Sequence, residues 1–332
     1  MAYGRFLLKR LLQGILVVWG VVSIVFMLRF VTPGSPVDAV APLDASPELR
    51  ERIAQELGLD QPLYVQYFDY LWDLLQGDMG YSYISGIEAS TMVFTKLPAT
   101  LELAIASSVV AITLSIPLGV ISATRRHQPA DYAATTFSLV GISTPNFWLG
   151  IMLILLLSVE FGLFPTSGRA IGLAEAFGLL FSDGAGAFLG GLWLWLKHIT
   201  LPAITLGTYF TALITRLTRS GMLEELGQSY VQAARAKGLP ETLIRYKHAL
   251  RNTLIPVITV LGLQLGTLIG GAVISEAVFS WPGLGTTLIT AINARDWPIL
   301  QGSLVVIGVG FVVVNILVDA VYGYLDPQVV TE

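Results

Sequence analysis

The chain has 332 residues, of which 54% are hydrophobic and only 13% charged, and its mean hydropathy is +0.70. Because a soluble domain usually has about 25% charged residues, this composition excludes one large soluble globule and a disordered chain. The absence of Cys excludes a disulfide scaffold and thiolate chemistry, and a net charge of −4 offers no basic surface for nucleic acid. The sequence predicts an all-α polytopic membrane protein.

Six apolar stretches are long enough to cross a bilayer, which takes about 20 residues each. The first is longer than the apolar core of a secretory signal, so we interpret it as a retained anchor. A seventh stretch, residues 177–196, is interrupted by Asp183 and by Gly, and we interpret it as an amphipathic segment at the outer interface. The six predicted spans are residues 11–31, 101–123, 133–159, 200–217, 254–279 and 299–323.

The distribution of basic residues predicts the orientation. With six spans, one side of the membrane receives twelve Lys and Arg residues and the other side receives seven. Basic residues favour the cytoplasmic side, so both ends of the chain are expected there. The resulting organisation is an N-terminal segment with the first span (1–31), an extracytoplasmic cap (32–100), a five-helix core (101–323) with a cytoplasmic loop at 218–253, and a cytoplasmic tail (324–332).

The cap is predicted to be a small folded unit. Ser46 followed by Pro47 is typical of a helix start, with Ser as the N-cap and Pro at the first position. Apolar and aromatic residues then recur at helical spacing between Leu63 and Leu74. The cap contains ten acidic and three basic residues. Because it is the largest outer loop, we consider two roles for it: a docking surface for a partner, which would involve Asp69 and Asp73, or a structural lid.

The cytoplasmic loop has the pattern of two helices separated by a sharp break. Residues 230–236 have good helix propensity, Gly238 is placed to end that helix, and Pro240 restarts a second helix that is expected to end near Arg251. One interpretation is a basic loop that fixes orientation and contacts anionic lipid. The other is a docking element whose small Ala residues enter a groove of a cytoplasmic partner.

Motifs spread over nearly the whole chain resemble one family of membrane transport proteins. Gln232-Ala233-Ala234-Arg235-Ala236-Lys237-Gly238 resembles the Glu-Ala-Ala-x-x-x-Gly loop of ABC importer permeases, with Gln in place of Glu. More narrowly, the chain is similar to the first permease subunit of dipeptide, oligopeptide and nickel importers. The segments that carry this resemblance are 5–10 (RFLLKR), 33–36 (PGSP), 57–62 (LGLDQP), 77–80 (GDMG), 97–103 (LPATLEL), 145–150 (PNFWLG), 279–285 (FSWPGLG) and 325–327 (LDP).

The resemblance implies a fold, partners and sites. The expected fold is that of type I ABC importer permeases (MetI-like), with six transmembrane helices and the cap between the first two. The expected partners are a second homologous permease, two ATP-binding subunits, an extracytoplasmic solute-binding protein and membrane lipid. The residues expected to contact the ATPase are Gln232, Ala233, Ala234, Arg235, Lys237 and Gly238. Trp281, Pro282 and Gly283 are expected at an outer gate or a binding-protein contact, together with Asp69 and Asp73.

No catalytic, cofactor or metal site is expected. None of the Lys residues follows Gly, so the chain lacks the Gly-Lys-Ser/Thr pattern of a P-loop, and ATP hydrolysis is assigned to partner subunits. The membrane acids Glu102, Glu276 and Asp319 lie near span ends, where structural pairing is the expected role. A secondary transporter or channel without ATPase partners, and an intramembrane hydrolase, are the alternatives. The solute could be a peptide, a nickel chelate, a glutathione-like compound or an oligosaccharide.

Overall fold

The computed structural model describes residues 2–31, 35–42 and 44–325, and the regular structure in these ranges is helical apart from one isolated bridge between Tyr81 and Glu88. The predicted tail lies outside the described residues beyond Leu325. Within these ranges the long helices are α1 (Ala2–Val31), α5 (Ala89–Thr124), α9 (Ala185–Leu226), α12 (Leu250–Phe279) and α14 (Trp297–Leu325). The shorter elements are α2 (Pro36–Val40), α3 (Pro47–Glu56), α4 (Leu63–Leu75), α6 (Pro129–Ser143), α7 (Asn146–Leu153), the π-helix η1 (Ile154–Glu160), α8 (Leu173–Ser182), α10 (Ser229–Ala236), α11 (Glu241–Leu243), the π-helix η2 (Ile244–Ala249) and α13 (Leu284–Ala294).

The number of spans agrees with the sequence prediction. By length and composition four helices of the described chain can cross a membrane, and two bent helix pairs raise the number to six. The first pair, α6 with α7 and η1, is bent by 108°. Pro145 causes this break because a residue before proline is pushed out of the helical region, and Thr144 is indeed extended, with φ −84° and ψ 123°. The predicted third span is therefore broken rather than continuous.

The second break falls where α12 meets α13. The end of α12 and α13 form an 84° corner, and Ser280 at the corner has the left-handed conformation, with φ 49°. Pro282, two residues later, cannot continue the ladder of helical hydrogen bonds. The chain therefore turns back sharply before it enters α14.

Residues 177–196, interpreted from the sequence as one amphipathic segment, are divided between two helices. Residues up to Ser182 form α8, whereas the stretch from Ala185 onward is the start of α9, a single helix of 42 residues that includes the fourth span. Pro202 lies inside this helix without ending it. Helices α8 and α9 pack closely, since a Cβ atom added to Gly191 would lie 2.8 Å from Leu179 Cδ1.

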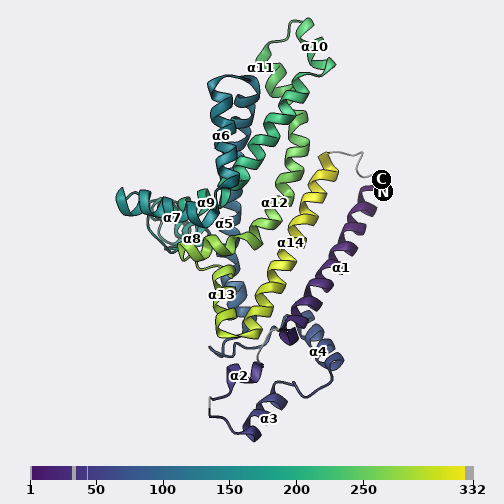
Figure 1. Cartoon of the computed structure of the whole chain (residues 1–332), viewed down its shortest axis with the longest axis vertical. Coiled ribbons are helices and arrows are strands. Elements are labelled where there is room, and N and C mark those ends of the chain that lie inside the picture. Colours follow the sequence, from purple (N-terminus) through teal and green to yellow (C-terminus); the bar gives the residue numbers. More distant parts are fainter. Residues whose placement is uncertain (1, 32–34, 43, 326–332) are drawn as a thin grey trace.

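The cap and the cytoplasmic loop lie at opposite ends of the molecule. Figure 1 shows α2, α3 and α4 at one end and α10 and α11 at the other. Ser46 caps α3 by accepting a hydrogen bond from the Leu49 amide, as the sequence predicted. Helix α4 packs on α1, where Tyr67 Oη lies 2.6 Å from Ser23 Oγ and the Tyr67 ring meets Phe26 edge-on. The cap is thus attached to the membrane helices by specific contacts.

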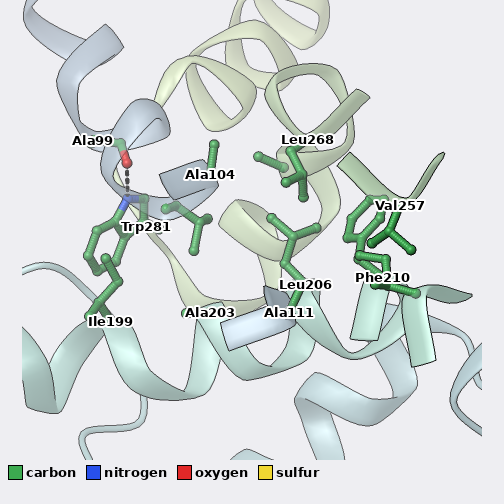
Figure 2. Packing of buried hydrophobic residues seen from close by; sticks show 13 residues of the cluster. Ala99, Ala104, Ala111, Ile199, Ala203, Leu206, Phe210, Val257, Leu268 and Trp281 are labelled. Carbon is green, nitrogen blue, oxygen red and sulfur yellow. Dashed lines mark hydrogen bonds between the residues drawn. The ribbon is translucent and has the colours of Figure 1, made fainter. Parts of the chain in front are cut away.

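The main core lies where α5, α9 and α12 meet. It combines small residues of α5 and α9 with larger residues from α9 and α12, and Figure 2 shows Leu206, Phe210, Val257 and Leu268 together there. Close approach is possible because the contacting positions are small: a Cβ atom on Gly207 would lie 2.8 Å from the Ser107 carbonyl oxygen. Small residues are the usual means by which membrane helices pack closely, because lipid removes the hydrophobic driving force between helices.

We predict that the two ends of the molecule lie on opposite sides of the membrane, with both chain termini on the cytoplasmic side. The native chain has no Cys, so single cysteines at the exposed positions Ser182 and Lys237 can be labelled without background. An impermeant thiol reagent added to intact cells is expected to label Ser182→Cys and to label Lys237→Cys only after permeabilisation. The opposite accessibility at either position would contradict the topology.

Candidate functional site

Helix α10 extends away from the membrane helices at the end of the molecule opposite the cap (Figure 1). Val231 and Ile244 are fully buried and fasten α10 and η2 to the protein. The predicted ATPase-contact residues are exposed, except Ala234, which is half-buried against its own chain. The free surface of α10 therefore carries Gln232, Ala233, Arg235, Ala236, Lys237 and Gly238.

Gly238 ends α10 in the way the sequence predicted. Its φ is +74°, the Gly238 amide donates to the Arg235 carbonyl oxygen at 2.9 Å, and the Leu239 amide donates to the Ala234 carbonyl oxygen at 3.2 Å. These two bonds form a Schellman motif, which satisfies carbonyls at the helix end. An added Cβ atom would meet nothing within 4 Å, so the requirement for Gly is conformational and not steric.

The second helix begins where the sequence predicted but does not end near Arg251. Pro240 precedes α11, and α11, η2 and α12 then follow one another without a break. Glu241 accepts hydrogen bonds from Arg235 at 2.7 Å and lies 3.3 Å from Arg245 Nε. The bond from Arg235 holds the pKa of Glu241 below its usual value. These contacts fix α10 against the start of the helix that becomes α12.

A closed set of hydrogen bonds that the sequence analysis missed joins α10 to both flanking helices. Tyr230 Oη donates to Glu225 Oε2 at 2.5 Å, and Asn252 Nδ2 donates to the same oxygen at 3.2 Å and to Tyr230 Oη at 3.1 Å. Desolvation and the bond to Glu225 raise the pKa of Tyr230, which keeps its hydroxyl available as a donor. Since Glu225 and Asn252 are 27 positions apart, no local sequence pattern reveals that they meet.

Below this set of bonds, a small apolar cluster supports the loop. Met222 of α9 and Ala249 of η2 are fully buried, and they pack with Val120 and Ala123 near the end of α5. Hydrogen bonds therefore join α10 to α9 and α12, and apolar packing joins α9 and η2 to α5.

At the other end of the core, Trp281 to Gly283 form the corner between α12 and α13. Trp281 is fully buried, and its indole N–H donates to the Ala99 carbonyl oxygen at 2.8 Å (Figure 2). A Cβ atom on Gly283 would lie 2.2 Å from Glu276 Oε1, so only Gly fits there. Pro282 is half-buried and lines a cavity of about 390 Å³ together with Lys96 and Thr286. In this structure Trp281 holds the corner and presents no surface to a partner.

The membrane acids are engaged in structural contacts, as the sequence predicted. Glu276 Oε1 accepts from Thr100 Oγ1 at 2.6 Å and Oε2 accepts from the Thr286 amide at 3.1 Å. Glu102 pairs with Arg169 at 2.9 Å, and Asp319 pairs with Arg10 at 3.2 Å. Among the described residues, no group of His, Asp and Glu could hold a metal ion.

Asp69 and Asp73 lie on α4, apart from the Trp281 corner. Both are exposed and line a cavity of about 290 Å³ that Arg29 and Asp78 also line. Partial burial and the nearby carboxylates of Asp78 and Asp69 raise the pKa of Asp73. The residues predicted for an outer gate or a binding-protein contact therefore lie in two different places. Trp281 to Gly283 form a buried corner, whereas Asp69 and Asp73 lie on an exposed acidic surface.

A bundle with six candidate spans, a docked cap at one end and a projecting helix at the other defines the membrane subunit of a transport system. Comparison with known proteins identifies the family. Residues 115–331 match binding-protein-dependent transport system inner membrane components, and residues 3–104 match the N-terminal part of such membrane components. The chain belongs to this family.

Known relatives are similar over almost their full length. The dipeptide transport system permease protein DppB of Escherichia coli K12 is 40% identical over 98% of both chains. The di/tripeptide transport system permease protein DppB of Pseudomonas aeruginosa is 42% identical, again over 98% of both. The fold is also that of the MetNI methionine ABC transporter in an inward-facing crystal form, with a TM-score of 0.52, 18% identity, and coverage of 71% of this chain and 96% of that one.

These findings confirm the main expectation from sequence. The chain is the membrane-spanning permease subunit of an ATP-driven, binding-protein-dependent importer and resides in the inner (cytoplasmic) membrane. It is not itself an enzyme, since the ATPase resides in separate subunits. The secondary-transporter alternative has no support.

We predict that the left-handed conformation at Gly238 maintains the end of α10. A β-branched residue is disfavoured there by about 1–2 kcal/mol, which corresponds to a factor of roughly 5 to 30 in the local opening equilibrium. Gly238→Val is expected to accelerate amide hydrogen exchange over residues 229–243 by that factor in the purified protein. Gly238→Asn is the matched control and should stay close to wild type, because Asn adopts this conformation far more readily. Equal exchange in the two variants would contradict the role given to the backbone.

Proposed function

We propose that α10 is the coupling helix that receives the motion of an ATP-binding subunit in an importer of peptides. The substrate class is suggested by relatives whose names specify dipeptide, di/tripeptide and oligopeptide transport. The observation that carries the coupling role is that α10 is exposed on its outer surface yet fastened to α9 and α12 at its base.

The exposed surface of α10 suits insertion into a groove. Ala233 and Ala236 present little bulk, while Arg235 and Lys237 supply positive charge at the side. Gln232 stands where the family pattern has Glu, so this position can contribute a hydrogen bond but no negative charge. Shape therefore matters more than charge at the centre of this contact.

The connections at the base of α10 suit the transmission of force. The Glu225–Tyr230–Asn252 bonds join α10 to the end of α9 and the start of α12, and Glu241 joins it to Arg245 of η2. A push on α10 therefore moves two membrane helices together and does not merely bend a loop.

A second homologous permease is needed to complete the transporter. This chain has one such projecting helix, and an importer driven by two ATP-binding subunits requires two. Each chain then supplies half of the translocation pathway, and the two-fold arrangement places one α10 over each ATP-binding subunit.

The coupling role predicts that added bulk on α10 uncouples the transporter. In Ala233→Trp the new side chain faces away from its own fold but overpacks the groove of the partner, at a cost of typically 1–3 kcal/mol. Membrane insertion and pairing with the second permease are expected to be retained, while transport in reconstituted vesicles is lost. ATPase activity should no longer respond to the loaded binding protein.

The matched control is Ala185→Trp, the same change at an exposed position at the start of α9. It should transport normally. Wild-type transport by Ala233→Trp would contradict the coupling role, and loss of insertion would indicate that the loop acts mainly in orientation. Transport of a labelled dipeptide, compared with that of an oligosaccharide, tests the substrate class separately.

We also propose that the cap helps to receive the solute-binding protein. Its acidic surface includes Asp69 and Asp73 on α4 and Asp78 just after α4, and these exposed residues lie around one cavity. Partial desolvation and, to a smaller extent, the nearby carboxylates of Asp78 and Asp69 raise the pKa of Asp73, and a basic patch on a partner would relieve the repulsion among these acids. The alternative role is a structural lid over the ends of α1 and α14.

Charge reversal distinguishes these two roles. Asp69→Lys with Asp73→Lys is expected to weaken association with the binding protein at low salt, with a smaller difference at high salt because ions screen exposed charges. Asp183→Lys, at an exposed position beyond α8, is the control and should bind normally. Unchanged association of the double variant at every ionic strength would favour the lid.

A further inference from the structure

A cavity of about 210 Å³ lies between α6 and α9, beside the end of α5. Its walls change character along its length. Helix α6 begins at the α5–α6 turn and runs away from it, so Thr135 lies nearer that turn than Leu139 and Ile142. Helix α9 runs the opposite way, so Arg216 and Arg219 lie toward the same end as the turn. One end of the cavity is therefore basic and hydroxylated, and the other is apolar.

One of the two arginines is already neutralised. Arg219 Nε and Nη2 donate to the two carboxylate oxygens of Asp131 at 2.7 and 3.0 Å. Asp131 also accepts from Ser122 Oγ at 2.6 Å and from the His127 amide at 3.0 Å. This acid is almost fully buried and its bonding capacity is largely taken up, so it does not compensate a further cation.

Arg216 is left without a partner. In the described chain no acid lies within ion-pair distance of its guanidinium, and its side chain is exposed. Arg125 and Arg126, at the end of α5 about one turn beyond Ser122, are exposed and lack ion pairs among the described residues in the same way. The polar end of the cavity thus has an excess of positive charge close to the inner face of the membrane.

We propose that this cavity binds an anionic phospholipid of the inner leaflet, with Arg216 contacting the phosphate and an acyl chain lying against Leu139 and Ile142. Guanidinium groups bind phosphate through paired hydrogen bonds, and basic pockets between membrane helices on the cytoplasmic side suit such head groups. The inference rests on the cytoplasmic placement of the α5–α6 turn, and not on the identity of the transported solute.

The apolar end of the cavity favours a lipid over a free phosphate ion. Inorganic phosphate would gain nothing from Leu139 and Ile142, whereas an acyl chain covers them. Phe137 and Val140 on the same helix are exposed apolar residues, as expected for a surface that faces hydrocarbon. Position, charge and polarity therefore agree on one ligand class.

The test uses the full chain, purified in detergent within its transporter complex, with lipid retention measured by native mass spectrometry. The wild type is expected to retain phosphatidylglycerol in preference to phosphatidylcholine. Arg216→Gln should weaken phosphatidylglycerol binding about five- to tenfold, the effect expected for one basic residue at an anionic lipid surface. Arg216→Lys should lie between the two, since it retains the charge but not the fork of donors.

Two further variants separate this site from general attraction. Lys9→Gln removes one exposed cation from α1 near the same membrane face and should leave retention unchanged. Ile142→Trp fills the apolar end of the cavity, so it should weaken binding of the long-chain lipid. Soluble glycerophosphoglycerol, which has the head group but no acyl chain, should compete only weakly with phosphatidylglycerol in all variants. Equal melting temperatures in lipid-free detergent establish that Arg216→Gln is folded.

Four results would overturn the proposal. Equal retention by the wild type and Arg216→Gln would show that Arg216 contacts no lipid, and an equal loss in Lys9→Gln would show that the attraction is unspecific. Displacement of the lipid by inorganic phosphate at similar concentration would assign the site to a free anion. Altered transport of acidic solutes with unchanged lipid retention would place the cavity on the translocation pathway instead.

Discussion

The close packing of α5 against α9 is the contact on which the rest of the molecule depends. A Cβ atom on Gly207 would come within 2.8 Å of the Ser107 carbonyl oxygen, and one on Gly119 within 2.5 Å of Thr218 Cβ. In a bilayer, where lipid is as apolar as the side chains, helices are held together by such close packing and by hydrogen bonds. The Arg219–Asp131 pair adds a bond between α9 and α6 beside this contact. Together these contacts hold α5, α6 and α9 as a central unit, and further hydrogen bonds attach other parts of the chain at each end of it.

Both attachments involve α12. At the outer end, Ala99 and Thr100 of α5 bind Trp281 and Glu276, which fixes the corner after α12. At the inner end, Asn252 of α12 bonds to Glu225 and Tyr230. The backbone hydrogen bonds of a membrane helix are satisfied within the helix, since lipid offers no hydrogen-bonding groups. A helix of this kind that is held at both ends can transmit displacement along its length. The geometry therefore connects the exposed surface of α10 to the outer corner through one element.

Charge is arranged so that buried acids are satisfied while exposed bases are left available. Glu276, Glu102 and Asp131 each receive two or more hydrogen bonds, as buried carboxylates require. Arg216, Arg125 and Arg126 remain without ion pairs in the described chain, at the end that the positive-inside rule places in the cytoplasm. The same residues that orient the protein are thus free to bind anionic lipid.

Local chemistry determined much of this structure. Composition alone indicated membrane helices. Gly238 indicated a left-handed conformation at the end of α10, and Ser46 with Pro47 indicated the start of α3. Gly262 and Gly266, four positions apart, face Val318 and Phe311 in the close packing of α12 with α14. Each of these features depends on residues within about one helical turn or on a repeated spacing, which a sequence displays directly.

Tertiary structure decided the features that depend on residues far apart in the chain. Propensity did not reveal that residues from Ala185 would join the fourth span in one helix, or that the second loop helix would run on into α12, because helix length is set by packing as much as by local preference. Trp281 looked like a candidate surface residue but is buried against Ala99, which is 182 positions away. The Glu225–Tyr230–Asn252 bonds and the cavity beside Arg216 exist only because separate helices bring single polar residues together, and no spacing within the sequence encodes that meeting.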